Sequence, residues 1–472
     1  MSTSSSSPVT ALGDYLKSVG GFFDDSLYGK KDSFGTSIYT SKSLPAGSKV
    51  VCCPFSLAVT PTLARQAVPT SLFPSHPSPP SARPSRQPNH ELLALYLCLH
   101  LLPSPLASRI PDLDLQHRVY VDHLPSAASM RSTLYFSPDE RELLRGSNLF
   151  GATEERERGW REELEEVKTW VLDEEVRGEL SWERWLWACT ILSSRAFPSS
   201  LIDGDKPNST PVLFPGIDML NHRPTSKVTW SSDVHVETVG TGADGKKGKG
   251  SLTIVLDEET PADEQVFNTY GAKSNEELLL GYGFTLPSNP ADAVALRLSI
   301  PPSKLATLRP TFFALNLDNY LHFVPRSGAI PPALLAQMRL LVADPDEFET
   351  VRLAVEDELS LDDEYPGTWE DVLGFVGWEN ELNVLDALEG MLESKLNGLQ
   401  TSGEASGEVR PDVREMVETY RESQMSILTA ALETRYRLFE DALGQAEEEG
   451  VILASEDEEM EEVDEESEED EE

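Results

Sequence analysis

Five short segments carry side chains that can bind a charged ligand or orient a reacting group. They supply carboxylates, a guanidinium, an amide, an imidazole and phenolic hydroxyls, and they are residues 32–36, 193–197, 218–222, 266–271 and 282–284. The Arg195 guanidinium suits a planar carboxylate, because its N–H groups can form two parallel hydrogen bonds. The Tyr270 hydroxyl suits the orientation of a nucleophile and the stabilisation of charge beside it.

The Asn221-His222 pair is the most informative of these features. An isolated Asn-His pair indicates little, because Asn89-His90 is another and stands just before a helix, where Asn is a common cap. What distinguishes Asn221-His222 is the apolar run 212–215 before it, which predicts a strand that ends at the pair.

Each segment also has a purely structural interpretation. Arg195 suits the C-terminus of a helix, and Tyr270 suits a buried strand whose hydroxyl is satisfied by the backbone. Tyr282 can simply pack, and Asp218 can be a structural carboxylate. The order and spacing of all the segments, rather than any one of them, carry the functional hypothesis.

Hydrophobic periodicity predicts the elements that position these groups. A short amphipathic helix is expected near residues 11–19, β-structure at 34–60, a Pro/Ser-rich loop at 61–88 and helices through 90–192, with Ser181 as an N-cap. Strands are expected at 212–220, 227–239 and 251–256, the last two joined as a long hairpin. Ser274 and Glu277 form a capping box that starts a helix just after Tyr270. Beyond Pro287 the pattern is almost wholly helical.

The charge distribution limits the classes of partner. The chain has 472 residues and a formal net charge of −42, and 17 acidic residues with no Lys or Arg fall between positions 447 and 472. That run predicts a disordered acidic tail. The overall charge argues against direct binding of nucleic acid and favours basic protein partners.

The four cysteines, Cys52, Cys53, Cys98 and Cys189, show neither paired zinc spacing nor a disulfide framework, so we predict no metal site and a reducing compartment. No secretory signal is evident, and the longest apolar run, 92–102, is too short for a membrane span. We therefore expect a soluble monomer of the cytoplasm and/or nucleus that does not bind membranes.

The five segments resemble, in order, those of a SET domain of the type found in the Rubisco large-subunit and ribosomal-protein lysine methyltransferases. The resemblance is strongest over 193–284, where Ser194-Arg195-Ala196-Phe197, Asn221-His222 and Tyr270-Gly271 match the family, whereas Ser33 and Arg223 depart from it. It implies an α+β fold: a SET-domain β-fold over 22–288 with a helical insert at about 90–192, preceded by a lead-in at 1–21. An all-α substrate-binding domain at 289–446 and the tail at 447–472 would follow.

The resemblance also implies a function. The chain would be a protein-lysine N-methyltransferase that uses S-adenosyl-L-methionine (AdoMet) and acts on a non-histone protein, by analogy a ribosomal protein. The cofactor would be bound by Asp32, Phe34, Arg195, Asn221, His222 and Tyr270. Tyr270 would be the catalytic tyrosine, and Ser194, Asp218 and Tyr282 would lie near the target lysine. Two alternatives stay open: a histidine methyltransferase of the same fold, and a non-catalytic SET-shaped module that binds basic proteins.

Overall fold

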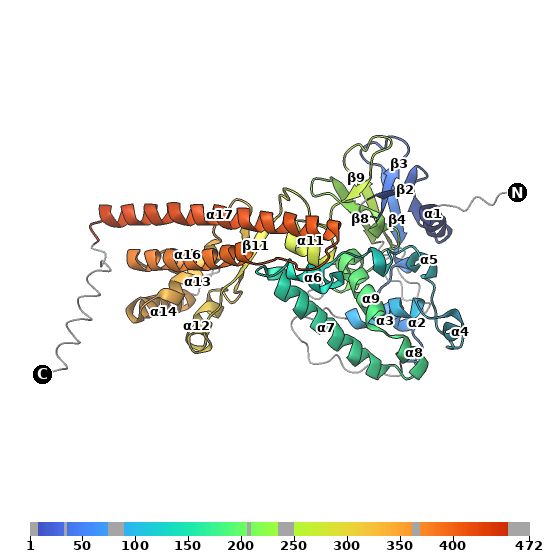
Figure 1. The fold of residues 1–472 in the computed structure, drawn as a ribbon, viewed down its shortest axis with the longest axis horizontal. Helices are drawn as coiled ribbons and strands as arrows, with labels where there is room; N and C mark the ends of the chain where they lie inside the picture. The colour runs from blue at the N-terminus through green and yellow to red at the C-terminus, as the bar shows by residue number, and fades with distance from the viewer. Residues whose placement is uncertain are drawn as a thin grey trace. The chain divides into compact units, whose positions relative to one another are not determined.

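The chain forms two compact units. The computed structural model describes residues 8–32, 35–73, 89–204, 209–234, 250–360 and 369–451. Unit 1 comprises 1–137 and 151–285, and unit 2 comprises 138–150 and 286–472 (Figure 1). The predicted acidic tail, apart from its first residues, lies outside the described residues. Among the described helices, none is long and apolar enough to cross a bilayer.

A four-stranded antiparallel sheet forms the β-core of unit 1. Its strand order is β1 (Phe22–Phe23), β4 (Lys49–Pro54), β9 (Gly250–Leu256) and β8 (Val228–Val234). Val50, Leu252 and Ile254 are fully buried in its core. The hairpin predicted over 227–256 is confirmed by the β8–β9 pairing, and its connection at 235–249 lies outside the described residues.

Three two-stranded pairs flank this sheet. They are β2 (Leu27–Asp32) with β3 (Gly35–Thr40), β5 (Phe197–Pro198) with β6 (Pro211–Val212), and β7 (Asn221–His222) with β10 (Phe267–Asn268). The prediction of one strand over 212–220 is wrong. Gly216 has φ 87°, in the left-handed region, and the chain forms a 3₁₀ turn, η4 (Ile217–Met219), before β7 begins.

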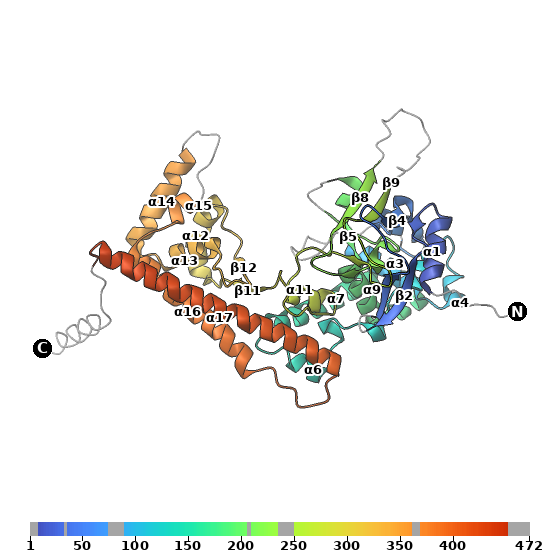
Figure 2. The ribbon, with the colours of Figure 1, turned by 90° about the horizontal axis from the view of Figure 1, so that it is seen from above.

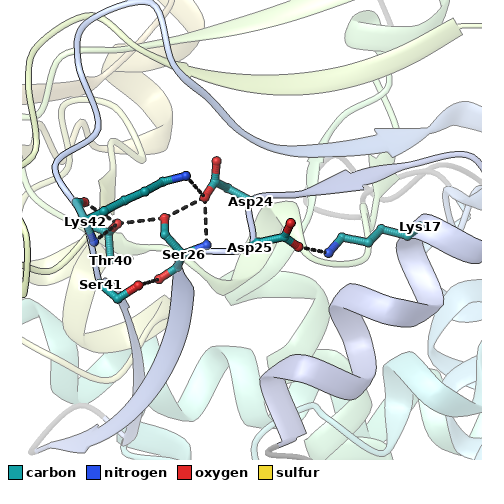
Figure 3. A network of polar contacts seen from close by, with 7 residues as sticks. All are labelled: Lys17, Asp24, Asp25, Ser26, Thr40, Ser41 and Lys42. Carbon is teal, nitrogen blue, oxygen red and sulfur yellow. Dashed lines mark hydrogen bonds and ion pairs between the residues drawn. The ribbon is translucent and has the colours of Figure 1, made fainter.

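Polar contacts fasten the base of the β2–β3 hairpin (Figure 3). The Ser26 backbone N–H donates to Asp24 at 2.9 Å, and the Ser26 and Thr40 hydroxyls lie 2.9 Å apart. Lys42 pairs with Asp24 at 3.5 Å, and Lys17 of α1 (Pro8–Ser18) pairs with Asp25. The hairpin is thereby tied to the N-terminal helix at the end opposite its turn.

The insert of unit 1 is helical, as predicted. Its main helices are α3 (His90–His100), all of whose residues are buried, and α9 (Trp182–Arg195), which Ser181 caps as expected. The other helices of this unit are α1 (Pro8–Ser18), α2 (Pro61–Ala67), α4 (Ser104–Ala107), α5 (Arg118–Val121), α8 (Glu174–Glu179), α10 (Ser200–Asp203) and α11 (Asn275–Gly281), with 3₁₀ turns η1 (Phe55–Leu57), η2 (Ala127–Ser129) and η3 (Thr133–Tyr135). The long helix α7 spans Asn148–Trp170.

The loop predicted over 61–88 is wrong at its start, because α2 occupies Pro61–Ala67. Pro61 stands in the first helical turn, where its missing N–H costs nothing, and the Thr60 side chain accepts from Leu63 N–H. Residues 74–88 lie outside the described residues.

A buried histidine in α3 predicts a pH-dependent stability. His100 is 1% exposed, its Nδ1–H donates to Tyr96 O at 2.9 Å, and burial lowers its pKa to about 4. Between that value and about 6.5, the pKa of an unfolded histidine, the unfolded chain binds a proton that the folded chain does not. The contribution to stability is therefore intact above pH 6.5 and is lost as the pH falls toward 4.

We expect His100 to lower the free energy of unfolding by about 1 kcal/mol between pH 7.5 and pH 5.5, as the difference between wild type and His100→Gln in urea titrations. Glutamine retains an N–H for Tyr96 O but does not titrate. Parallel pH profiles for the two proteins would contradict this assignment.

Unit 2 is mainly helical. It contains α6 (Pro138–Glu142), α12 (Pro302–Ala314), α13 (Pro332–Val342), α14 (Pro345–Ser360), α15 (Trp369–Leu373), α16 (Trp378–Thr401) and α17 (Pro411–Glu448). Figure 2 shows α16 and α17 side by side, and Leu388, Leu392 and Ile427 are buried in the shared core. Inside this unit Arg339 forms a two-pronged, largely buried ion pair with Glu381 at 2.6 and 2.8 Å.

One feature of unit 2 differs from the expected all-helical pattern. The antiparallel hairpin β11 (Ala293–Arg297) and β12 (Leu321–Pro325) stands at its start. Val294 and Leu296 alternate with less buried neighbours, so the segment has the period of a strand rather than of a helix.

Candidate active site

Two segments far apart in the sequence meet in unit 1 through a short parallel pairing. Phe267 pairs with Asn221 and Asn268 pairs with His222, and the Arg223 N–H donates to Asn268 O at 3.0 Å. Because the polypeptide continues from Asn268 to Tyr270, this pairing fixes Tyr270 beside His222.

Aromatic rings gather at this point. The His222 and Tyr270 rings stack at 4.9 Å and 19°, and the Tyr270 and Tyr282 rings stack at 5.2 Å and 23°. Phe284 packs near both ends of this row, 6.4 Å from His222 and 6.3 Å from Tyr282. The arrangement creates a largely apolar wall of stacked rings.

The protonation of His222 follows from its contacts. The Tyr270 backbone N–H donates to Nδ1 at 3.0 Å, so the proton of the neutral ring lies on Nε2. Burial lowers the pKa of His222, which keeps the ring neutral at physiological pH.

The Tyr270 hydroxyl is held in a defined orientation. It donates to Leu220 O at 2.9 Å. Burial raises the pKa of Tyr270, and although Arg195 opposes this shift, Tyr282 and Asp218 add to it. The hydroxyl therefore stays protonated and acts as an oriented dipole, not as a base, while its oxygen keeps lone-pair capacity for a reacting group.

A buried carboxylate lies directly before Asn221-His222. The Asp218 side chain is 1% exposed, and its Oδ2 accepts from Tyr120 OH at 2.8 Å and from Arg195 Nη1 at 3.1 Å. Arg195 Nη1 also donates to Asp218 O at 2.8 Å. Burial alone would lower the pKa of Arg195, but Asp218 and Tyr120 raise it. The Asp218 Oδ1 atom is buried and has no hydrogen-bond partner among the described residues.

The two asparagines of the paired strands have different environments. Asn221 donates from Nδ2 to Ser37 Oγ of β3 at 2.7 Å, which joins the β2–β3 hairpin to β7. Asn268 is fully buried, and its Oδ1 accepts from Trp230 Nε1 at 2.8 Å. Its Nδ2 finds no partner within the described part of the chain, so it is a spare donor beside the Asn221-His222 pair.

Tyr282 is positioned by the end of α11. The predicted capping box of Ser274 and Glu277 is confirmed at the start of this helix. Gly283 then takes φ 82°, and a Cβ atom there would lie 2.6 Å from Ser132 N. Only glycine therefore lets the chain turn so closely against this backbone while Tyr282 stacks on Tyr270.

We expect Gly283→Ala to destabilise the protein by about 1–3 kcal/mol, because alanine meets both an unfavourable φ and a backbone clash. Thermal unfolding would measure the effect. Gly281→Ala is the matched control: Gly281 lies in the last turn of α11 with nothing within 4 Å of its added Cβ, so it should be neutral or stabilising by about 0.5–1 kcal/mol. Equal losses in both variants would contradict the role of Gly283.

The structure brings most of the predicted site residues together. Arg195, Asp218, Asn221, His222, Tyr270 and Tyr282 are linked by the contacts described above. Ser194 differs, because its hydroxyl donates to Thr190 O of its own helix at 2.7 Å, whereas Ser193 reaches Gly281 O of α11. Asp32 ends β2, and Phe34 lies outside the described residues.

Sequence reasoning missed several partners of these residues. Ser37 accepts from Asn221, Tyr120 donates to Asp218, and Asn268 pairs with His222, but none of the three was predicted as a site residue. Asn268 had a usable signal, because it is a polar residue inside the site segment 266–271. The Leu220 carbonyl is a backbone group, so the sequence gives no indication that it accepts from Tyr270.

Comparison with known proteins agrees with this geometry. No family model matches the chain. A ribosomal lysine N-methyltransferase of Schizosaccharomyces pombe is 30% identical over 300 residues, which cover 62% of this chain and 49% of the relative. Ribosomal lysine N-methyltransferase 1 of Saccharomyces cerevisiae is 29% identical over 235 residues, which cover 42% of this chain and 37% of the relative. The chain thus spans about half or less of the length of these curated relatives.

A crystal structure of the SET domain of LSMT bound to lysine and AdoHcy resembles this chain, with a TM-score of 0.70, 19% identity and coverage of 93% of each chain. The expected fold class, a SET-domain β-fold with a helical insert followed by a helical region, is thereby confirmed.

Proposed function

We propose that this chain, a SET-domain protein of the Rubisco and ribosomal-protein lysine methyltransferase type, is an AdoMet-dependent protein-lysine N-methyltransferase that acts on a non-histone protein. The observation that carries the proposal is the junction of Asn221-His222 with Tyr270, where an oriented, neutral hydroxyl lies within an aromatic wall. Relatives named ribosomal lysine N-methyltransferases support the choice of lysine.

The residues present fit AdoMet, which would supply a methyl group on a positively charged sulfur. The spare Asn268 amide N–H and the polar groups of Asn221 and His222 suit its amino-acid and nucleoside parts. Arg195 is held by Asp218 through Nη1, and its guanidinium has further donors for a carboxylate.

The side chains of the protein would contribute by positioning the target amine. The Tyr270 hydroxyl, fixed on Leu220 O, would accept from or align the target amine. Lysine must lose its proton first, and its reference pKa near 10.4 makes this unfavourable in water. Desolvation against the aromatic wall lowers that pKa and favours the neutral amine.

Asp218 is poorly suited to remove that proton. Its Oδ2 already accepts hydrogen bonds from Tyr120 and Arg195. Its spare Oδ1 suits a contact with a cationic amine instead. We therefore assign Asp218 a role in binding the target amine. The proton that the amine loses would be taken up by solvent.

The proposed substrate is a basic protein, by analogy a ribosomal protein, because the chain carries a net charge of −42 and the relatives include ribosomal lysine methyltransferases. We also propose that the protein is a monomer and that it is located in the cytoplasm and/or the nucleus.

The test is methylation of ribosomal subunits, taken from cells that lack this protein, with methyl-labelled AdoMet. We expect a labelled ribosomal protein with wild type and none with an Asn221→Ala/His222→Ala variant. Label only in other cell fractions would retain the methyltransferase and refute the ribosomal substrate. Absence of label in every fraction would favour a non-catalytic binding module.

A further inference from the structure

Three potential metal ligands meet inside the helical insert of unit 1. They are His90 at the start of α3, Glu163 of α7 and Cys189 of α9, and one donor atom from each lies within 4.8 Å of the others. His90 and Glu163 are 6% and 8% exposed, and Cys189 is fully buried. None of the three takes part in the active site described above.

The donor set is mixed in a way that metals prefer. An imidazole nitrogen, a carboxylate oxygen and a thiolate sulfur are all ligands of zinc, and three protein ligands with one open position are a common coordination pattern. His90 Nδ1 and Glu163 Oε2 are 3.2 Å apart, close to the separation of two ligands in a tetrahedral zinc site. We propose that His90, Glu163 and Cys189 bind a divalent transition-metal ion, with zinc as the physiological metal.

The surroundings would protect such an ion from water. The site lies in the apolar core of the insert, among residues that include Leu164 and Ile191. The Trp160 ring, one helical turn before Glu163, stacks on His90 at 6.2 Å and 19°. A low-dielectric shell of this kind strengthens each bond between the ion and its charged ligands.

The three donor atoms would have to move only a short distance to bind one ion. Two ligands that each lie about 2.0–2.3 Å from one ion are at most about 4.6 Å apart. All the donor atoms here lie within 4.8 Å of one another, so side-chain movements of about 1 Å are enough to bring them to tetrahedral spacing. On coordination the thiol proton is released to solvent and the sulfur binds as thiolate. The proton that His90 Nδ1 donates to Glu163 must move to Nε2, which leaves the Nδ1 lone pair free for the ion.

A His90–Glu163 hydrogen bond alone is the competing explanation of the contact. It accounts for two of the donors but gives no reason for a thiol from a third helix beside them. The two explanations differ in what happens when a metal ion is offered to the protein.

Cobalt is the probe that distinguishes them, because a Co²⁺–thiolate bond gives a charge-transfer absorption in the near ultraviolet that oxygen and nitrogen ligands do not. The purified full-length protein would be stripped with a chelator and titrated with Co²⁺. We expect this absorption to saturate at about one ion per chain, to vanish on addition of Zn²⁺, and to be lost in Cys189→Ser.

Cys98→Ser is the matched control. Cys98 is another buried cysteine of the insert, on α3, and its thiol is 3.5 Å from Arg184 O. This variant should keep the absorption. If Cys189→Ser does not fold, His90→Gln should weaken Co²⁺ binding by at least tenfold.

Two results would overturn the proposal: no thiolate absorption in the wild-type protein, or the same absorption in wild type and Cys189→Ser. The melting temperature gives a separate readout. Zn²⁺ should raise it for wild type and for Cys98→Ser but leave His90→Gln unchanged.

Discussion

Replacing Tyr270 with phenylalanine is expected to lower kcat for methyl transfer by about 10²–10³-fold, the usual effect of removing one oriented polar group from a reacting centre. The ring would remain stacked between His222 and Tyr282. Only the hydroxyl that donates to Leu220 O would be lost. AdoMet affinity, measured by calorimetry, should change little because the ring stack, Arg195 and the Asn221-His222 pair all persist.

Loss of this hydroxyl also has a structural effect that must be separated from catalysis. Leu220 O would lose its donor, which costs about 1–3 kcal/mol in a buried position. Thermal unfolding would measure this cost independently. Tyr282→Phe is the control, since it removes a hydroxyl from the same aromatic row without touching Leu220. A kcat for Tyr270→Phe within about threefold of wild type would exclude Tyr270 from catalysis.

The second large effect is expected at the ion pair between the buried Asp218 and Arg195, whose side chain is 26% exposed. Removal of one partner from a buried ion pair leaves an uncompensated charge and costs about 3–5 kcal/mol. Asp218→Ala would leave the Arg195 guanidinium without its carboxylate and the Tyr120 hydroxyl without its acceptor. We therefore expect a loss of this size in the free energy of unfolding measured with urea.

The double variant Asp218→Leu/Arg195→Met separates stability from function. Without either charge, much of the stability should return, because a buried ion pair can be replaced by apolar residues at little net cost. Methyl transfer should stay low, since both polar groups beside Asn221-His222 are gone. Glu165→Ala, which removes an exposed partner of Lys168, is the surface control and should cost less than about 1 kcal/mol.

If Asp218→Ala unfolded with the stability of wild type, the carboxylate would have no structural role. A double variant as unstable as Asp218→Ala would instead mean that Tyr120, left without an acceptor, dominates the loss.

Local signals predicted much of the fold. The Ser181 cap of α9 and the Ser274–Glu277 capping box depend on residues within one helical turn, so the sequence displays them directly. The β8–β9 hairpin also joins two segments that are close in the sequence, and each shows its strand-forming residues directly. The SET resemblance added the order of the site segments, which no periodicity reveals.

What the sequence could not show depends on contacts between distant segments. The break at Gly216 was hidden because an apolar run looks the same whether it continues as a strand or turns through a positive φ. The bonds of Tyr120 to Asp218 and of Ser37 to Asn221 join residues about 98 and 184 positions apart. The three donors of His90, Glu163 and Cys189 come from three separate helices and share no spacing pattern.

The identity of the methylated amino acid would decide whether this protein is a lysine methyltransferase. Protein labelled by the wild-type chain with methyl-labelled AdoMet would be hydrolysed completely and separated against methyl-lysine and methyl-histidine standards. We expect label in methyl-lysine that disappears with Asn221→Ala/His222→Ala. Label in methyl-histidine, or none together with no AdoMet binding by calorimetry, would contradict it.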